Sequence, residues 1–361
     1  MLFNIVVFIL ILSVLVIIHE MGHFIAARFF KMNVEEFGIG YPPKILTLFK
    51  WKGIPFTLNA IPFGGFVKLD GEIPDDENAK RTEGQFWPRP GWQRLIVLCA
   101  GVLCNFIFGV LAFTILYSKY GIPVAPPPTV AIISPGSPAE TAGLKVGDTF
   151  NAVGSTPVTS IDQFKNIITA NQGNNVDIFV LRDGKTEKVT AHIRTEKDRP
   201  SDQGLLGVAF PEPTVKFYPW YEMPFRAGYT GTKQALLFGK MVVTSLADVG
   251  RQAVVDKKVT TQLSGPIGIV YEADKQKLFA DGFFGDLNFA ALLSINLAVI
   301  NILPLPALDG GRVFLLLFER FLNHKRRAKL ENIINTIGFA LIISLIVVIS
   351  FSDIAHILQS K

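Results

Sequence analysis

The sequence predicts a multi-pass α-helical membrane protein with four transmembrane helices, an inserted extracytoplasmic α+β domain and a membrane-dipping β-hairpin. Three observations lead to this fold class. The 361 residues are 49% hydrophobic and only 18% charged, whereas a soluble chain of this size carries roughly a quarter charged residues. The apolar residues gather in four long runs. One stretch between these runs has the composition of a soluble domain.

Residues 1–121 are predicted to form the first half of a membrane core. Its two spans run from about Leu2 to Phe30 and from about Leu95 to Tyr117, and each exceeds the roughly 20 apolar residues that cross a bilayer. The first run leads into a His-Glu pair and not into a small-residue cleavage site. We therefore interpret it as a retained helix and not as a signal peptide.

The loop between these spans contains two short β-like runs, within residues 54–69, on either side of Pro62-Phe63-Gly64-Gly65. This pattern predicts a hairpin that turns at the Pro/Gly segment. The hairpin is apolar enough to dip into the membrane. Because unpaired backbone groups are not tolerated in lipid, its strand edge would have to lie against protein or pair with a strand from another chain. An ordinary cytoplasmic hairpin is the alternative.

Residues 122–211 have the composition of a soluble domain. The segment Ser137–Asp148 resembles the signature of a PDZ domain, and residues 150–154 and 176–184 match that family's pattern too. About ninety residues leave room for one such domain. Residues 212–285 are predicted to be a linker, in which residues 220–246 form either an amphipathic helix on the outer membrane surface or an appendage of the soluble domain.

Residues 286–361 are predicted to be the second half of the membrane core. The third span, from about Leu287 to Phe318, is interrupted by prolines and glycines, and the fourth covers about Ile333 to Phe351. Basic residues are concentrated between the first two spans and between the last two, so both loops are expected to be cytoplasmic, with the termini and the PDZ domain outside. His19 lies roughly 25 Å along the first span, which predicts an active site near the cytoplasmic leaflet.

His19, Glu20 and His23 form a His-Glu-x-x-His motif inside the first predicted span. On a helix the two histidines, at positions i and i+4, leave the same face and can share one metal ion. Glu20 is placed to hold and deprotonate a water molecule beside that metal. Because ionisable groups in lipid are costly, the cluster predicts a functional site and not a pair of packed core histidines.

A catalytic zinc ion commonly takes three protein ligands, so the motif lacks one. The remaining histidines, His192, His324 and His356, lie in the soluble domain, a cytoplasmic loop and the C-terminal tail, and none is well placed. Asp309 lies in the third apolar run, among two prolines and two glycines that break the helix. A carboxylate at such a break can turn inward to the metal. A helix-capping role is the alternative for Asp309.

The His-Glu motif at 19–23, taken with the run from Asn301 to Gly311, resembles the paired signature of the site-2 family of intramembrane metalloproteases. The chain is most similar to the bacterial regulator-of-sigma-E protease (RseP) type, which carries an extracytoplasmic PDZ insertion. Further matching segments are residues 37–40, 62–67, 100–105 and 264–269. Two departures stand out: Val102 occupies a position where many relatives have proline, and the best-known type has two PDZ domains.

The resemblance implies one Zn²⁺ ion per chain, held by His19, His23 and Asp309, with Glu20 as the catalytic residue. It also implies that Asn301 contacts the substrate backbone. Interhelical hydrogen bonding is the alternative for Asn301. Gly64 and Gly65, in the predicted hairpin turn, are added as candidate substrate-binding residues.

The function implied is that of a zinc-dependent intramembrane endopeptidase, a metalloendopeptidase of the bacterial inner (cytoplasmic) membrane. It would cleave single-pass membrane proteins, such as anti-sigma-factor-like substrates or remnant signal peptides, in regulated intramembrane proteolysis. The PDZ domain would bind a peptide C-terminus or act as a steric gate. No nucleic-acid partner is expected, because the basic residues flank apolar runs. Two alternatives from other classes are a non-catalytic membrane scaffold and a metal transporter.

Overall fold

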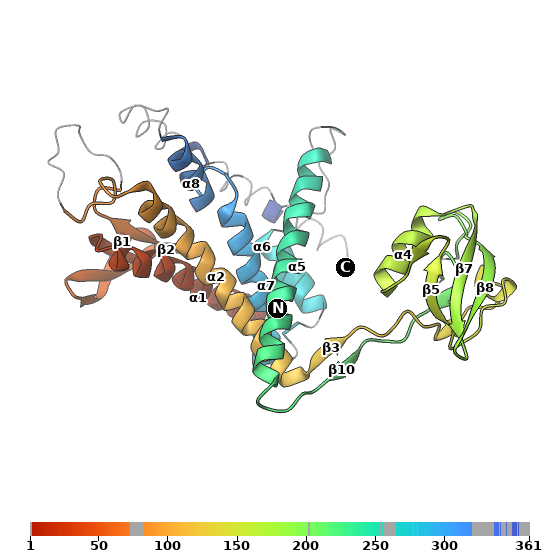
Figure 1. Cartoon of the computed structure of the whole chain (residues 1–361). Coiled ribbons are helices and arrows are strands. Elements are labelled where there is room, and N and C mark those ends of the chain that lie inside the picture. The colour runs from red at the N-terminus through yellow and green to blue at the C-terminus, as the bar shows by residue number, and fades with distance from the viewer. Residues whose placement is uncertain are drawn as a thin grey trace. The chain divides into compact units, whose positions relative to one another are not determined.

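The computed structural model describes residues 2–72, 83–200, 203–252, 255, 265–276, 278–279, 281–319, 336–338, 340, 344, 349–351 and 353. The chain divides into two compact units. A membrane unit combines Met1–Lys119 with Trp220–Lys361, and the second unit is Tyr120–Pro219 (Figure 1). The membrane unit therefore resumes at Trp220, so that most of the predicted linker at 212–285 belongs to it.

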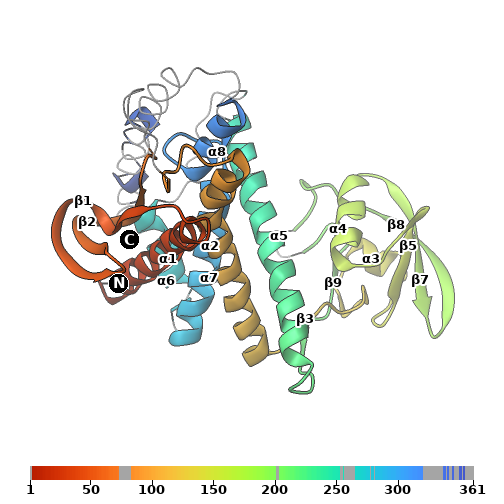
Figure 2. The ribbon, with the colours of Figure 1, turned by 60° about the vertical axis from the view of Figure 1, so that its left-hand side comes forward.

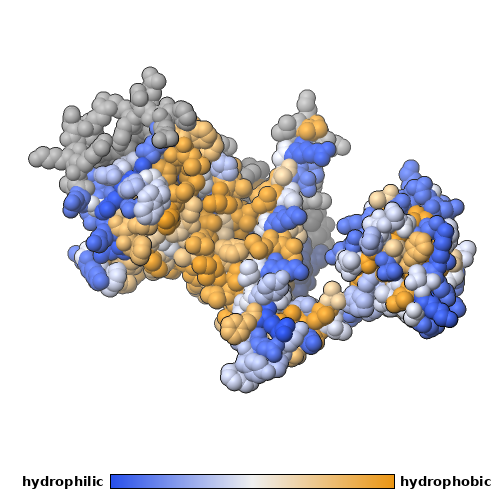
Figure 3. Space-filling view, viewed as in Figure 1, coloured by the Kyte–Doolittle hydropathy of each residue, from blue (hydrophilic) through white to orange (hydrophobic). Residues whose placement is uncertain are grey.

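Three helices among the described residues are long and apolar enough to cross a membrane: α1 (Leu2–Phe29), α2 (Gly91–Tyr120) and α7 (Phe283–Ile302). Large apolar side chains remain exposed on their surfaces, and Figure 3 shows them as a continuous apolar area of the membrane unit. On α2 they recur every four residues, at Leu103, Ile107, Leu111 and Ile115. Such a stripe is typical of a helix that faces lipid. The predicted fourth span at 333–351 lies largely outside the described residues.

The third predicted span is two helices joined by a break. α7 ends at Ile302, and α8 (Asp309–Leu317) begins after a short irregular segment. Gly310 makes this fold-back possible, because a Cβ atom at that position would collide with the carbonyl oxygens of Ile302 and Leu303. The prolines of the break thus end α7, and the glycines allow α8 to start close beside its last turn.

The β-hairpin is longer than predicted and turns elsewhere. It consists of β1 (Val34–Trp51) and β2 (Ile54–Leu69), joined by Lys52 and Gly53 at φ 49° and 84°, which are the positive φ angles that a tight hairpin turn requires. The predicted turn at residues 62–65 is therefore wrong. Gly64, at φ +100°, lies in a strand that continues to Leu69.

The two long strands are bent, and the bend creates an edge. Residues 37–39 of β1 pair on one side with residues 56–58 of β2 and on the other side with residues 65–67. The end of β2, Gly65–Leu69, therefore has β1 on one side and no further described strand on the other. The curved ribbon lies beside α1 (Figure 2).

α5 (Met223–Arg251) packs within the membrane unit along α2 and α7. Its buried residues Ala227, Gly231 and Ala235 are small and four residues apart, and a Cβ atom at Gly231 would lie 3.1 Å from the backbone of Val110 and Thr114 on α2. Small residues at this spacing let helix backbones approach closely. The predicted position of residues 220–246 on the membrane surface stays a prediction. α6 (Pro266–Lys275) packs against the first half of α1.

The second unit is an α+β domain. A four-stranded antiparallel sheet has the order β6 (Thr156–Pro157), β5 (Thr149–Val153), β7 (Asn175–Arg182) and β8 (Lys185–His192). The helices α3 (Pro138–Thr141) and α4 (Ile161–Ala170) accompany it, and α4 packs Phe164 onto Phe150 of β5. Two short strand pairs complete the unit: β4 (Ile132–Ile133) with β9 (Val208–Ala209), and β3 (Ile122–Val124) with β10 (Thr214–Lys216). The PDZ assignment stays a prediction.

Candidate metal centre

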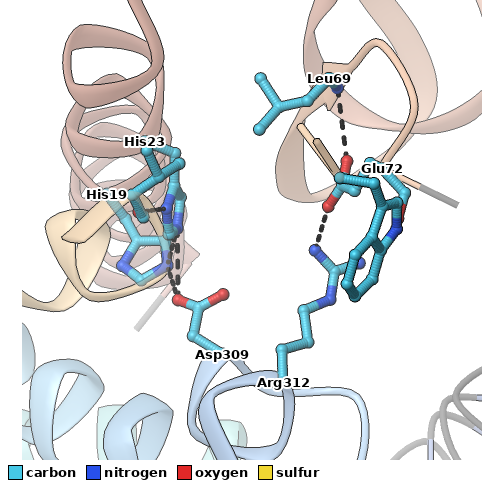
Figure 4. Close-up of polar contacts among 8 residues, drawn as sticks. His19, His23, Leu69, Glu72, Asp309 and Arg312 are labelled. Carbon is cyan, nitrogen blue, oxygen red and sulfur yellow. Dashed lines mark hydrogen bonds and ion pairs between the residues drawn. The ribbon is translucent and has the colours of Figure 1, made fainter. Parts of the chain in front are cut away.

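Three side chains converge where α1 meets the start of α8. His19 and His23 leave one face of α1, and their Nε2 atoms are 3.2 Å apart. Oδ2 of Asp309, the first residue of α8, lies 2.9 Å from Nε2 of His19 and 3.2 Å from Nε2 of His23 (Figure 4). Among the described residues, this is the group of histidines and acidic residues with the spacing of a metal site. The structure thus brings together the three predicted ligands.

Contacts on the far side of each imidazole set its tautomer. Nδ1 of His23 lies 2.8 Å from the carbonyl oxygen of Val97, and since a carbonyl only accepts, Nδ1 carries the proton. The fully buried side-chain amide of Asn105 lies 3.5 Å from Nδ1 of His19, and its Oδ1 has no hydrogen-bond partner among the described residues. Amide oxygen and nitrogen are assigned from their partners, so exchanging them lets Oδ1 accept from His19. Both rings then direct an Nε2 lone pair at Asp309.

This arrangement fits a zinc ion. Oδ2 of Asp309 is buried and receives no hydrogen bond within the described part of the chain, so three electron-rich atoms face one another without a proton between them. In a tetrahedral zinc site with bonds of 2.0–2.1 Å, ligand atoms are separated by roughly 3.3 Å. The separations here are 2.9, 3.2 and 3.2 Å. Two imidazoles and a carboxylate are also a known catalytic zinc donor set.

Two glycines allow α2 to approach the histidines. A Cβ atom on Gly101 would lie 2.8 Å from Nε2 of His19 and closer still to Nε2 of His23. On the facing helix, a Cβ atom on Gly22 would collide with the carbonyl oxygen of Ala100. Gly101 and Asn105 are four residues apart and so share one face of α2. The sequence prediction assigned no role to Gly101 or Asn105, although their four-residue spacing indicates that both lie on one face of the helix.

A cavity of about 360 Å³ opens beside this cluster. Glu20, His23 and Asp309 line it, together with the β2 edge from Gly65 to Leu69. Glu20 lies against Gly65, since a Cβ atom there would be 3.0 Å from Cγ of Glu20. The predicted catalytic carboxylate therefore shares one cavity with His23, with Asp309 and with the strand edge.

The other predicted residues are less central. Asn301 lies partly buried in the last turn of α7, and neither it nor Gly64 is among the described residues that line the cavity. The capping alternative for Asp309 is not supported, because Leu308 is the N-cap residue of α8. His192 is exposed in the second unit and contacts Asn175, and His324 and His356 lie outside the described residues.

Two ion pairs anchor α8 to its surroundings. Arg312, which sequence reasoning left without a role, pairs with Glu72 just beyond the end of β2. Glu72 in turn accepts a hydrogen bond from the backbone N–H of Leu69 (Figure 4). At the far end of α8, Glu319 pairs with Arg94 of α2 at 2.8 Å. The helix that carries Asp309 is thus tied to both the hairpin and α2.

A histidine pair at i and i+4, an intervening glutamate and a distant aspartate are typical of the site of a mononuclear zinc hydrolase. Comparison with known proteins agrees with this class. Residues 7–345 match the model of peptidase family M50. The chain therefore belongs to peptidase family M50, the site-2 protease family, and is a zinc metalloprotease of the membrane.

Individual relatives match over nearly the whole chain. A protein of Clostridium acetobutylicum named as a candidate zinc metalloprotease is 32% identical over 357 residues, with 98% of each chain covered. A similarly named protein of Clostridium perfringens is 29% identical, covering 95% of this chain and 96% of the relative. The zinc metalloprotease RasP of Oceanobacillus iheyensis is 28% identical, and the match covers 98% of this chain and 99% of the relative.

Proposed function

We propose that this zinc metalloprotease is an intramembrane endopeptidase that cleaves transmembrane segments of single-pass membrane proteins. The observation that carries the proposal is the position of the three convergent side chains. His19 and His23 lie on a helix apolar enough to cross a membrane, and Asp309 follows a second such helix. His19 is roughly 25 Å from the start of α1, and Gly101, which it contacts, is roughly 15 Å from the start of α2.

In this proposal His19, His23 and Asp309 hold one Zn²⁺ ion and Glu20 is the general base. Zinc, when bound, supplies Lewis-acid chemistry that polarises a carbonyl and makes water more acidic. Glu20 accepts the proton of the attacking water, and the water oxygen bonds to the carbonyl carbon of the substrate. Glu20 then passes that proton to the amide nitrogen as the peptide bond breaks.

The β2 edge gives the substrate a binding mode. A transmembrane helix has its carbonyl groups hydrogen-bonded internally, so it has to unwind before a peptide bond is attacked. Gly65–Leu69 lines the cavity, and no described strand pairs with its outer side. An unwound substrate that adds there as a strand regains backbone hydrogen bonds beside Glu20. We propose that Gly65 then contacts the substrate backbone, and that Asn301 and Gly64 bind the substrate outside the described lining of the cavity.

Orientation and substrates follow from the resemblance and the charge pattern. We place the protein in a bacterial inner membrane, with both cytoplasmic loops basic and the second unit, as a PDZ domain, outside. Substrates are then anti-sigma-factor-like proteins or remnant signal peptides in regulated intramembrane proteolysis. The PDZ domain either binds a newly exposed C-terminus or restricts access by bulky ectodomains.

The test compares the wild-type protein with Glu20→Gln, using Glu272→Gln on α6, away from the cavity, as the matched control. All three are purified in detergent, their zinc is measured, and a model single-pass substrate is supplied. We expect about one zinc per chain in each protein, and cleavage slowed at least 10²-fold in Glu20→Gln alone, since a general base contributes roughly 10²–10⁴-fold. Equal cleavage by wild type and Glu20→Gln contradicts the protease mechanism.

The same proteins separate the two alternative functions. A scaffold retains its function in Glu20→Gln and cleaves nothing. A metal transporter carries zinc across the membrane of sealed vesicles, whereas the protease retains its zinc and transports none. Zinc uptake by vesicles containing the wild-type protein, without substrate cleavage, would replace the protease proposal with transport.

A further inference from the structure

The cavity beside the metal centre holds more polar groups than the proposed mechanism uses. Apart from Glu20 and the metal-ligating side chains, four of its described lining residues carry polar side chains: Tyr41, Lys68, Glu72 and Arg312. Three of these are committed to ion pairs. Arg312 pairs with Glu72, and Lys68 pairs with Glu35 at 2.7 Å and is 61% exposed. Tyr41 contributes the one neutral hydroxyl group among the described lining residues.

The position of Tyr41 is set by the Gly64–Gly65 step of β2. A Cβ atom on Gly64 would lie 3.0 Å from Cδ2 and 3.1 Å from Cζ of Tyr41, so this glycine leaves room for the ring. A Cβ atom on the next residue, Gly65, would lie 3.0 Å from Cγ of Glu20, so Gly65 leaves room for the Glu20 side chain. Cα atoms of adjacent residues are about 3.8 Å apart. Tyr41 and Glu20 therefore flank consecutive residues of the strand that lines the cavity.

A hydroxyl group at this place matches the charge that peptide hydrolysis creates. When water adds to a peptide carbonyl, the carbonyl oxygen becomes negative, and a fixed hydrogen-bond donor directed at that oxygen lowers the barrier. A tyrosine has an ordinary pKa of about 10, so its hydroxyl is protonated at neutral pH and has a proton to donate.

We propose that Tyr41 is a second catalytic residue, which donates a hydrogen bond from its phenolic hydroxyl to the scissile carbonyl oxygen as that oxygen gains negative charge. This role rests on the proposed function of the site. It also gives Gly64 a purpose, because a side chain at Gly64 would displace the Tyr41 ring. The hairpin then supplies both a strand edge for the substrate and a donor for its reacting carbonyl.

The substitution Tyr41→Phe isolates the hydroxyl, since phenylalanine keeps the ring that packs on Gly64. Tyr117→Phe is the matched control, because Tyr117 lies on α2 in a separate hydrophobic cluster with Phe113. Full-length proteins are compared in detergent for zinc content, thermal unfolding, and kcat and KM on a model single-pass substrate. A peptide carrying a phosphinic group, which mimics the tetrahedral oxyanion, serves as a binding probe.

For Tyr41→Phe we expect kcat to fall roughly 10²–10³-fold, as for removal of an oxyanion donor, while KM stays within about twofold. Affinity for the phosphinic peptide should fall, whereas affinity for the same peptide without that group, zinc content and thermal unfolding should match wild type. A kcat within threefold of wild type overturns the proposal. Loss of zinc or a lower unfolding temperature in Tyr41→Phe would assign Tyr41 a structural role. A change in KM alone would assign it a role in substrate binding. Each of these results also overturns the proposal. A wild-type protein that cleaves nothing refutes the proposed function itself.

Discussion

The contact between Gly101 and the two histidines leads to a quantitative prediction. A Cβ atom added by Gly101→Ala would lie 2.8 Å from Nε2 of His19, whereas ordinary contacts begin near 3.4 Å. The imidazole has to move by roughly 0.6 Å, yet zinc ligand distances tolerate only about ±0.2 Å. We expect the affinity for zinc to fall at least 10–100-fold, the range seen when residues behind zinc ligands are altered.

The same substitution should leave the protein folded. Overpacking of this kind lowers the free energy of unfolding by about 1–3 kcal/mol. The higher helix propensity of alanine raises it by up to about 1 kcal/mol. Gly109→Ala is the matched control, because Gly109 lies two turns further along α2, where an added Cβ atom meets the side chain of Ile295 and not a histidine. Zinc affinity is measured by competition with a chromophoric chelator. A Gly101→Ala protein that binds one zinc ion with wild-type affinity would refute the proposed ligand geometry.

Three further predictions concern other parts of the structure. Asn105→Ala should lower zinc affinity roughly 10–100-fold by removing the acceptor behind His19, and Asn105→Asp should restore most of it. Proline at Phe66 or at Val67, tested separately because adjacent N–H groups face opposite edges, should slow cleavage in at least one variant with zinc retained. In the second unit, burial alone raises the pKa of Asp148, but hydrogen bonds from Arg182 lower it overall. Asp148 therefore stabilises the fold above its unfolded pKa of about 3.9, and this stability is lost as pH falls through the lower folded pKa.

Each of these predictions has its own control and contrary outcome. Zinc titration reports on Asn105, and equal affinity in the alanine and aspartate variants would exclude a role as acceptor. Phe66→Ala and Val67→Ala keep the backbone N–H groups, so wild-type cleavage by both proline variants would argue against strand addition. Hydrogen exchange of the second unit between about pH 2 and 6 reports on Asp148. Asp148→Asn should lessen the acid dependence seen in wild type, and an unchanged profile would contradict the assigned pKa shift.

The convergence of His19, His23 and Asp309 was predictable because its signals are local. His19 and His23 are four residues apart on a long apolar helix, and that spacing alone places both rings on one face. Asp309 stands out because a carboxylate within an apolar run is energetically costly and therefore indicates a functional site. The structure brings these three side chains to within 3.2 Å of one another. No local sequence pattern predicts this distance, because Asp309 is far from the histidines in the sequence.

The residues that sequence reasoning missed act through contacts between distant segments. Gly101 and Asn105 share a face of α2, but only the packing of α2 on α1 shows that this face meets the histidines. The turn of the hairpin was misplaced because Pro62-Phe63-Gly64-Gly65 has the composition of a turn. Gly64 instead bends a continuing strand, and Lys52-Gly53 reverses the chain. The pairing of Arg312 with Glu72 likewise depends on where α8 starts.

The position of the cleaved bond tests the central claim most directly. A single-pass substrate in lipid vesicles is digested by the wild-type protein, and its fragments are identified by mass spectrometry, with Glu20→Gln as the blank. The proposed zinc site lies between helices that can cross the membrane, roughly 15 Å from the start of α2. We therefore predict cleavage within the transmembrane segment of the substrate, in its cytoplasmic half. Cleavage confined to the loops outside the membrane would contradict an intramembrane active site.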